Sequence, residues 1–301
     1  MYIADMHCDS IMKVNADNGL VSAYNTSKNH PFLQLFAAFT PFGGRSMESR
    51  RKAVKHALDV YLYECERLDL VKLTDARSIC YATDNRKSSS MFTVEGGGGL
   101  LADSDELFTL YKAGLRIMSF AWDTNELATS CYDESGEGLT SEGIRMAKRC
   151  DDLGITVDVS HLSDKSFYDL LNVYPLPVIA THSNYRDVCD HPRNLTLDMA
   201  KRIIARGGVI GLNLYPNFVS SGEVSIEDII PHIEYHLEHF GDVGLGFGFD
   251  IDGTDGKYPK GVGESSSIHD TVLELLLKRY PESTVRKIAG ENVLDFLKGV
   301  L

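Results

Sequence analysis

Short apolar segments alternate with longer amphipathic ones from residue 2 to about residue 250. The short segments are rich in β-branched and aromatic residues, which indicates strands, and the long ones repeat apolar residues every three or four positions, which indicates helices. The eight predicted strands are residues 2–7, 33–39, 91–95, 115–122, 155–160, 177–181, 207–212 and 243–249. Helices predicted between them include residues 49–68, 142–153, 197–206 and 226–239.

This alternation predicts an α/β protein, because eight β/α repeats in about 250 residues fit a closed (β/α)8 TIM-type barrel. A doubly wound open sheet alternates in the same way, but it usually carries a glycine-rich fingerprint after its first strand. Here that place holds His7-Cys8-Asp9, which favours the barrel. Residues 33–39 have a helix as their alternative, because segment 32–42 is aromatic on both faces.

The chain beyond the predicted barrel adds C-terminal helices, of which 268–277 and 291–297 have the clearest pattern. No segment rich in proline, glycine and serine divides the sequence, so we expect residues 1–301 to form a single domain.

Composition and charge exclude several classes of protein. With 43% hydrophobic and 24% charged residues, the 301-residue chain has ordinary globular composition. Thirty basic against 43 acidic residues give a formal charge of -13, which argues against a nucleic-acid partner. No apolar run reaches the roughly 18 to 20 residues of a membrane helix, and Asp5, His7 and Asp9 stand where a signal peptide would be apolar. We therefore expect a cytoplasmic protein with no membrane contact.

The six cysteines have no paired spacing, so neither a disulfide framework nor a thiolate zinc site is predicted. Metal-ligating residue types instead follow the predicted strands. Because active sites of barrel enzymes form at the carboxyl ends of the strands, these residues are candidates for one common site. Five of the eight strand ends carry such residues, in His7-Cys8-Asp9, Glu95, Asp158-Val159-Ser160-His161, Thr181-His182-Ser183 and Asp250-Ile251-Asp252.

His7 and Asp9 are two positions apart, so on an extended backbone their side chains point to the same side. One His-x-Asp pair is a weak signal that is often structural, but His161 and His182 follow consecutive predicted strands. A carboxylate and two imidazoles buried together need a partner, and a metal ion supplies it. These nitrogen and oxygen ligands suit zinc, manganese, iron or cobalt.

Glu95 is the natural bridge between two ions, since a shared carboxylate would give each of them three protein ligands. The alternative is a carboxylate that caps a helix beginning after the glycines 96–99. These four glycines match no phosphate-binding motif, and we expect them to allow the backbone to approach the metals closely.

Three further residues are candidates for catalysis or binding. Asp250 could accept a proton from the nucleophilic water and return it to a leaving amine, although Asp252 could do the same. Arg193 could hold a substrate carboxylate, with a surface salt bridge as the alternative.

Other histidines are not assigned to the site. His232 and His236 on the predicted helix 226–239 lack the spacing of a zinc-protease motif, and we expect them on a solvated face. His269 has no neighbouring ligand and is left without a role.

Taken together, the ordered segments resemble the renal or membrane dipeptidase family of metallopeptidases, within the amidohydrolase-type barrel enzymes. The matching segments are Asp5-Met6-His7-Cys8-Asp9, Val94-Glu95-Gly96, Gly138-Leu139-Thr140, Asp158-Val159-Ser160-His161, Thr181-His182-Ser183, Arg193-Asn194, Gly207-Gly208, the run from Gly246 to Gly253, and Gly290-Glu291-Asn292. They cover nearly the whole chain.

The resemblance implies that His7 and Asp9 bind one zinc ion, that His161 and His182 bind the other, and that Glu95 bridges them. It also implies that Arg193 holds the free carboxylate of a dipeptide and that Asp250 transfers the proton. Dipeptides with a D-residue at the carboxyl-terminal position are often tolerated in the family, and a homodimer would fit it.

One departure from the family lies at the end of the fourth predicted strand. Trp122 stands where animal members have a histidine thought to contact the substrate and the developing oxyanion. Tryptophan offers one N–H donor and an apolar wall but cannot change its protonation state. Trp122 is therefore a candidate substrate-binding residue.

The sequence thus predicts a zinc-dependent dipeptidase with two divalent metal ions, with Glu95 and Asp250 as its catalytic residues. One alternative is another hydrolase of the same barrel type that acts on a lactone, a cyclic amide or an amidine. The other is a ligand-binding descendant that has lost catalysis.

Overall fold

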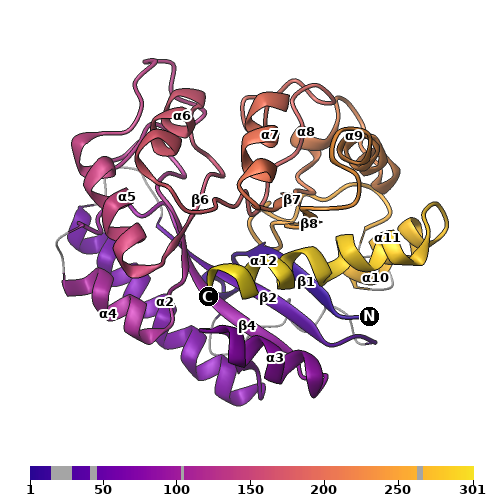
Figure 1. Ribbon diagram of the computed structural model, residues 1–301, viewed down its shortest axis with the longest axis horizontal. Helices are drawn as coiled ribbons and strands as arrows, with labels where there is room; N and C mark the ends of the chain where they lie inside the picture. The colour runs from indigo at the N-terminus through magenta and orange to yellow at the C-terminus, as the bar shows by residue number, and fades with distance from the viewer. Residues whose placement is uncertain (15–28, 41–45, 103–104, 263–266) are drawn as a thin grey trace.

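A curled parallel sheet covered by helices forms the centre of the computed structural model, which describes residues 1–14, 29–40, 46–102, 105–262 and 267–301 (Figure 1). Its strands follow one another in the order β6-β5-β4-β2-β1-β8-β7, and β3 pairs with β4 beside this path. The strands are β1 (Ile3–Cys8), β2 (Phe32–Phe39), β3 (Val71–Lys72), β4 (Ser89–Glu95), β5 (Ile117–Ser119), β6 (Thr156–Asp158), β7 (Ile210–Leu212) and β8 (Leu245–Phe247).

The helices lie on the outside of this sheet and across one of its ends (Figure 1). They are α2 (Met47–Arg67), α3 (Ala76–Asp84), α4 (Asp105–Ala113), α5 (Ser141–Leu153), α6 (Asp164–Val173), α7 (Leu197–Ala205), α8 (Pro216–Val219), α9 (Ile230–Phe240), α10 (Ile268–Leu277), α11 (Glu282–Arg286) and α12 (Asn292–Val300). Three shorter helical turns are Ser10–Met12, Ile226–Ile229 and Lys287–Glu291.

Single-residue bridges connect the two ends of the ordered sheet. Ile179 forms a parallel bridge with Asp158 of β6, and the next residue, Ala180, forms one with Ile210 of β7. The backbone N–H of Val159 donates to Ile179 over 2.8 Å, and that of Ala180 donates to Val209 over 3.0 Å. The predicted strand 177–181 is therefore present as two bridges rather than as a regular strand.

Four other predicted strands are shorter than expected at one or both ends. Residues 115–122, 155–160, 207–212 and 243–249 contain the strands β5, β6, β7 and β8, each only three residues long. After β6 and β8 the backbone turns into the left-handed region, with φ values of 70° at His161 and 60° at Asp250. Such turns leave the hydrogen-bonding ladder and direct the following side chains toward a common point.

The helix considered for residues 32–42 is wrong for the described part of that segment. Phe32–Phe39 is strand β2, which pairs with β1 on one side and with β4 on the other. A strand between two neighbours in a curled sheet is covered on both faces, which accounts for its apolar residues on both sides. The strand β3 is one that the hydrophobic pattern did not predict.

Several helices begin directly after a residue whose side chain caps the helix. Thr140 before α5 accepts from the backbone N–H of Gly143, and Thr196 before α7 accepts from that of Met199. These caps satisfy backbone donors that have no partner within the helix. The predicted bounds of 142–153 and 197–206 agree with α5 and α7 to within about one residue, and 268–277 agrees with α10.

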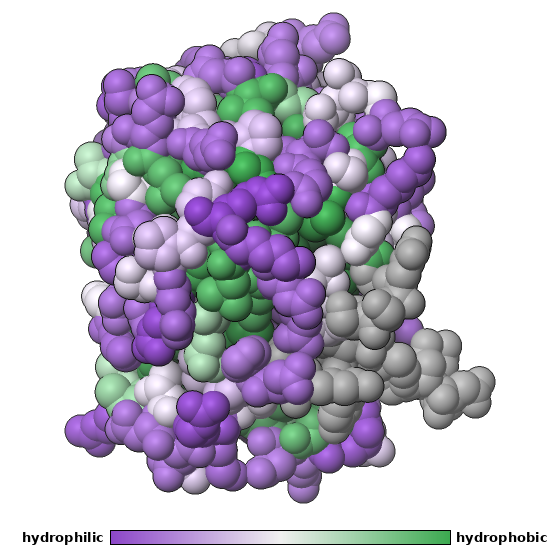
Figure 2. Space-filling model, turned by 90° about the vertical axis from the view of Figure 1, so that its right-hand side faces the viewer, coloured by the Kyte–Doolittle hydropathy of each residue, from purple (hydrophilic) through white to green (hydrophobic). Residues whose placement is uncertain are grey.

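The C-terminal helix α12 packs on an apolar cluster of the sheet. Val293 and Leu297 of α12 are fully buried with Ala4 and Met6 of β1 and Leu35 of β2. The opposite, carboxyl ends of the strands carry the polar candidates. The face of the molecule beside α11 is mostly hydrophilic, with smaller apolar areas between the polar residues (Figure 2). Among the described helices, none has both the length and the apolar character needed to cross a bilayer.

Candidate metal centre

The five predicted metal ligands lie together at the carboxyl ends of the strands. His7 is in β1, Glu95 is the last residue of β4, and His161 and His182 follow β6 and the bridging segment 179–180. Asp9 follows β1 directly. All five are buried, with exposed fractions between 1% for His182 and 9% for Asp9.

Glu95 lies between two groups of these side chains. Its Oε1 is 2.9 Å from Nε2 of His161 and 3.3 Å from Nε2 of His182. Its Oε2 is 3.7 Å from Nε2 of His7, and that nitrogen is 3.8 Å from Oδ1 of Asp9. One carboxylate therefore presents one oxygen to each half of the cluster.

These distances fit a site for divalent cations. Ligands at about 2.0–2.2 Å from a zinc ion lie roughly 3.3–3.6 Å from one another in a tetrahedral arrangement. Nε2 of His7 and Oδ1 of Asp9 are buried and have no hydrogen-bond partner in the described structure. Unpaired buried polar atoms are costly, and a cation is a partner that suits the chemistry of both atoms. Among the described residues, two triplets have ligand atoms close enough to hold an ion, namely His7 with Glu95 and His182, and His7 with Asp9 and Asp250.

The electrostatics of the cluster show how closely the charged groups are held. Burial alone would lower the pKa of His7, but the carboxylates of Glu95, Asp9 and Asp250 raise it to about 10. Burial and the neighbouring Glu95 hold the pKa of Asp9 well above its ordinary value. Burial and, to a smaller extent, Arg193 lower the pKa of His161. Several carboxylates are thus held close together in a largely buried site.

The prediction that His7 and Asp9 point to the same side of an extended strand is wrong, although their side chains do lie close together. Asp9 does not continue the extended strand, because its backbone has φ -97° and ψ 11°. The pairing register of β1 also shifts between Asp5 and Cys8, which is a β-bulge or irregularity. A bulge changes the direction of side chains locally. The two side chains meet because of this irregular strand end and not because of alternation along a strand.

Asp250 and Asp252 have different surroundings. Oδ1 of Asp250 lies 3.9 Å from Nε2 of His7, and its Oδ2 accepts from the side-chain amide of Asn213 over 3.1 Å. Asp252 instead accepts from the hydroxyl of Ser10 over 2.7 Å. The geometry therefore brings Asp250, rather than Asp252, into the cluster.

The glycines after Glu95 serve a different purpose from the one expected. A Cβ atom on Gly97 would meet the side chain of Met118, and one on Gly98 would meet Arg50 and Asn125. The absent side chains make room for Met118, Arg50 and Asn125, none of which is a candidate ligand. No helix begins directly after these glycines, so Glu95 is not a helix cap.

Arg193 is buried, with 3% of its surface exposed, and is not part of a surface salt bridge. One terminal nitrogen donates to the hydroxyl of Ser183 and the other to the backbone oxygen of His182, each over 2.9 Å. Its Nε is buried without a hydrogen-bond partner in the described structure. The guanidinium thus supports the segment that carries His182, and it has further N–H groups that none of these hydrogen bonds uses.

Trp122 lies at the edge of the cluster with 36% of its surface exposed. Its ring meets Phe39 edge-on, with 4.8 Å between the ring centroids, and lies 6.2 Å from the ring of His161. This places an apolar wall next to one of the candidate ligands.

The expectation of a solvated face for His232 and His236 is wrong, since both are fully buried in α9. Nε2 of His232 pairs with the backbone oxygen of Val219 over 2.9 Å, and that of His236 pairs with Val243 over 2.8 Å. Burial lowers the pKa of each to about 4. They are neutral structural histidines that join α9 to neighbouring segments.

Several residues that hold the cluster in place had no predicted role. Asn213 directly follows β7 and donates to Asp250. Its position after a predicted apolar strand is the feature of the sequence that could have identified it. Asp5 accepts from the backbone N–H groups of His7 and Phe249 over 3.1 and 3.2 Å. Asp158 and Thr181 lie behind His182, on the side of Nδ1. Their signal was the strand-end position that they share with the candidate ligands.

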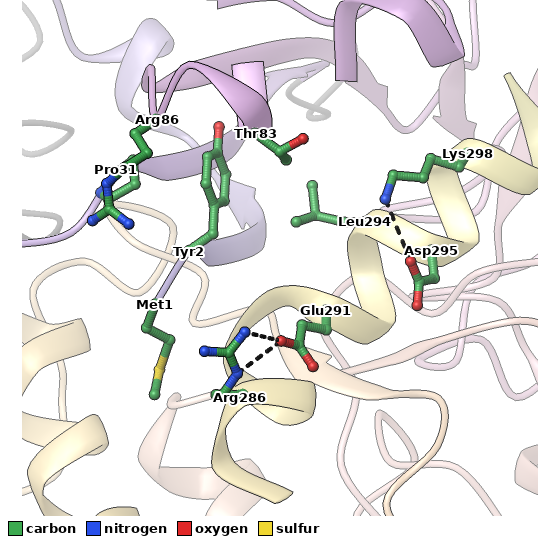
Figure 3. Close-up of a pocket in the computed structure, with 10 residues that line it drawn as sticks. All are labelled: Met1, Tyr2, Pro31, Thr83, Arg86, Arg286, Glu291, Leu294, Asp295 and Lys298. Carbon is green, nitrogen blue, oxygen red and sulfur yellow. Dashed lines mark hydrogen bonds and ion pairs between the residues drawn. The ribbon is translucent and has the colours of Figure 1, made fainter. Parts of the chain in front are cut away.

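A separate cavity of about 360 Å³ lies at the other end of β1 (Figure 3). Met1 and Tyr2, which precede β1, line it together with residues of the C-terminal helices. Four of its charged side chains form two pairs, Arg286 with Glu291 over 2.7 Å and Lys298 with Asp295 over 3.6 Å (Figure 3). It is therefore distinct from the candidate metal centre.

Solved structures of metallopeptidases share this fold. A metallopeptidase from Rhodobacter sphaeroides, solved with a phosphinate mimic of the dipeptide L-Ala-D-Ala, has a TM-score of 0.88 and 22% identity, covering 100% of this chain and 99% of that one. A dipeptidase of peptidase family M19 has a TM-score of 0.86 and 23% identity, covering 100% and 98% of the two chains.

Two related sequences are similar over part of their length. An uncharacterized dipeptidase of Schizosaccharomyces pombe is 30% identical over 216 residues, which are 70% of this chain and 53% of that protein. An uncharacterized protein in the pqqA 5′ region of Klebsiella pneumoniae is 29% identical over 219 residues, covering 69% of this chain and 80% of that protein. The model of one family, described as membrane dipeptidase (peptidase family M19), matches residues 1–300. Because that match spans nearly the whole chain, the protein belongs to the membrane dipeptidase family of metallopeptidases, peptidase family M19.

Proposed function

We propose that this protein is a binuclear-metal dipeptidase that hydrolyses the peptide bond of free dipeptides and accepts a D-residue at the carboxyl-terminal position. The observation that carries the proposal is the position of Glu95, whose two carboxylate oxygens face two separate groups of ligands. The M19 family of metallopeptidases supports the reaction class. The L-Ala-D-Ala mimic bound by the Rhodobacter sphaeroides protein supports the substrate class.

In this proposal His7 and Asp9 hold one divalent ion, His161 and His182 hold the other, and Glu95 contacts both. The single-residue bridges at Ile179 and Ala180 support a closed (β/α)8 barrel that fixes these strand ends. The nitrogen and oxygen ligands suit zinc, manganese, iron or cobalt, and zinc is the ion that the family resemblance implies. When bound, divalent ions polarise a substrate carbonyl and make water a nucleophile at neutral pH.

The chain's own residues would supply proton transfer and orientation. Asn213 holds Oδ2 of Asp250, which leaves Oδ1 directed toward the cluster, where it can take a proton from water and pass it to the leaving amine. Arg193 has five N–H groups, of which the two described bonds use two, so others can bind the substrate carboxylate. Trp122 would provide an apolar wall for a substrate side chain.

Hydrolysis of L-Ala-L-Ala and L-Ala-D-Ala by the purified protein with added Zn²⁺, Mn²⁺ or Co²⁺ tests this proposal. We expect cleavage of both peptides, at least a thousandfold loss of kcat in Glu95→Gln and His182→Ala, and an unchanged rate in His56→Ala, whose side chain is exposed on α2. Metal-dependent cleavage near the parent rate in His182→Ala would contradict the assignment.

The proposed binding of the substrate carboxylate by Arg193, here called the carboxylate clamp, has a separate test. Arg193→Ala should raise KM for free dipeptides much more than for dipeptides with an amidated carboxyl group, because only the former carry the negative charge. Equal losses on both substrates would contradict the clamp and would favour a hydrolase for uncharged substrates, such as a lactone or a cyclic amide.

A further inference from the structure

A buried chain of hydrogen bonds lies behind His182, on the side of the ring that faces away from Glu95. The hydroxyl of Thr181 is 2.7 Å from Nδ1 of His182 and 2.6 Å from Oδ2 of Asp158. The three residues are 1–3% exposed. The hydrogen bonds thus connect His182, Thr181 and Asp158 directly, within the protein interior.

The number of available protons decides the direction of these bonds. A threonine hydroxyl has one proton to donate, and a carboxylate can only accept. Oδ1 of Asp158 already accepts from the backbone N–H groups of Ser160 and Thr181, over 2.9 and 3.0 Å. Thr181 therefore donates its proton to Oδ2 of Asp158, and its oxygen accepts from His182. The proton of the neutral His182 ring is then on Nδ1.

We propose that Asp158 and Thr181 are positioning residues that fix His182 as the Nδ1–H tautomer, so that Nε2 keeps its lone pair for a metal ion. This inference rests on the proposed function, in which His182 is a ligand. Nε2 of His182 lies 3.3 Å from Oε1 of Glu95 and 3.0 Å from Nε2 of His161, at the centre of the cluster. A proton on Nε2 would block binding there, and a hydrogen bond to the other ring nitrogen is the general means of preventing it.

His161, the other candidate ligand next to Oε1 of Glu95, lacks such a hydrogen bond behind its ring among the described residues. Nδ1 of His161 is buried and has no hydrogen-bond partner within the described structure. The hydrogen bonds of His161 therefore do not select its tautomer in the same way. The two histidines therefore differ in their support, because in the described part of the chain only Nδ1 of His182 has a hydrogen-bond partner behind the ring.

Thr181 is the better position for a test, since Asp158 also holds the backbone of the bridging segment. Thr181→Val keeps the shape of the side chain and removes the hydroxyl, whereas Thr181→Ser keeps the hydroxyl. The matched pair separates the hydrogen bond from the packing.

The first measurement uses metal-free protein labelled with ¹⁵N-histidine, in which long-range ¹H–¹⁵N spectra report the tautomer of each ring. The His182 signals are those that disappear in His182→Asn. We expect the Nδ1–H pattern for His182 in the parent and in Thr181→Ser, and its loss in Thr181→Val. An Nε2–H pattern in the parent, or an unchanged pattern in Thr181→Val, would overturn the inference.

The second measurement is the affinity for Zn²⁺, determined by competition with a chelator. Loss of such a supporting hydrogen bond costs about 10- to 100-fold in metal affinity, so one of two Zn²⁺ equivalents should bind that much more weakly in Thr181→Val and normally in Thr181→Ser. Equal affinities in Thr181→Val and the parent would overturn the inference. If the parent binds no Zn²⁺, the proposed function fails. The tautomer measured without metal still decides whether Asp158 and Thr181 fix the proton of His182 on Nδ1.

Discussion

The imidazole of His7 lies close to three carboxylates of the site, those of Glu95, Asp9 and Asp250. Burial would lower its pKa, but Glu95, Asp9 and Asp250 raise it to about 10 in the metal-free protein. The ordinary value for histidine, which applies to the unfolded chain, is about 6.5. The folded protein therefore holds this proton more tightly than the unfolded chain does. The resulting stabilisation is complete below about pH 6.5 and is lost as the pH rises through about 10.

This difference predicts the pH dependence of stability in the absence of metal. Between pH 6.5 and 10, the free energy of unfolding of chelator-treated protein should fall further in the parent than in His7→Gln. The excess should be at least about 1.4 kcal/mol, the value of one pKa unit. Urea titrations of both proteins at several pH values measure it. Parallel pH profiles would show that His7 does not carry the effect.

Gly253 is the second residue with a specific role in the site. A Cβ atom at this position would press on Oδ1 of Asp250 and would lie 2.6 Å from Oδ2 of Asp9. Both carboxylates would have to move. Gly253→Ala should therefore weaken Zn²⁺ binding by about 10-fold or more, as other changes that displace ligands do.

Gly299→Ala is the matched control for this prediction, because nothing lies within 4 Å of the added atom. Its Zn²⁺ affinity, measured by the same chelator competition, should equal that of the parent. Parent-like affinity in Gly253→Ala would mean that the two carboxylates tolerate the displacement.

Strand ends and helices are tied together by buried polar contacts at the scale of secondary-structure elements. Oδ1 of Asp5 joins β1 to the segment after β8 through the backbone of His7 and Phe249. Its Oδ2 accepts from Nε2 of His269 in α10 over 2.8 Å, and both side chains are fully buried. The sequence assigned no role to His269, because its partner lies 264 positions away.

This contact predicts a stability effect outside the candidate site. His269→Ala leaves a buried carboxylate oxygen without its donor, which costs about 1–3 kcal/mol. The added cavity increases the loss. Thermal or urea unfolding should show this loss, whereas His56→Ala, on the exposed side of α2, should stay within about 0.5 kcal/mol of the parent. Equal stabilities of the two variants would contradict a structural role for His269.

For the whole molecule, stability and metal binding are associated with opposite ends of the sheet. The apolar contacts of α12 with β1 and β2 lie at the end where the chain begins, and the candidate ligands lie where the strands end. The residues that line the cavity beside α12 take no part in the metal cluster (Figure 3). A change in the apolar end should therefore affect folding without affecting the site.

Leu297→Ala tests this separation, since Leu297 is fully buried in α12. It should reduce the free energy of unfolding by about 2–5 kcal/mol and leave the Zn²⁺ equivalents per folded chain unchanged. Leu277→Ala, at a leucine that is 48% exposed, should change both properties little. A loss of Zn²⁺ equivalents in folded Leu297→Ala would show that the two ends are coupled.

The sequence by itself determined the α/β class, the positions of most strands and the identity of the residues that gather at the strand ends. It could do so because hydrophobic periodicity is local, and because side chains that follow parallel strands meet at one edge of the sheet. His7, Glu95, His161 and His182 were found in this way, and the structure brings them together.

Only the tertiary structure decided what depends on contacts between distant segments. The burial of His232 and His236, the pairing of Asp5 with His269, and the choice of Asp250 over Asp252 have no local signal. Strand 177–181 is reduced to two bridges, and Asp9 reaches His7 through an irregular turn. Each outcome follows from backbone geometry and long-range packing, which a pattern of neighbouring residues does not contain.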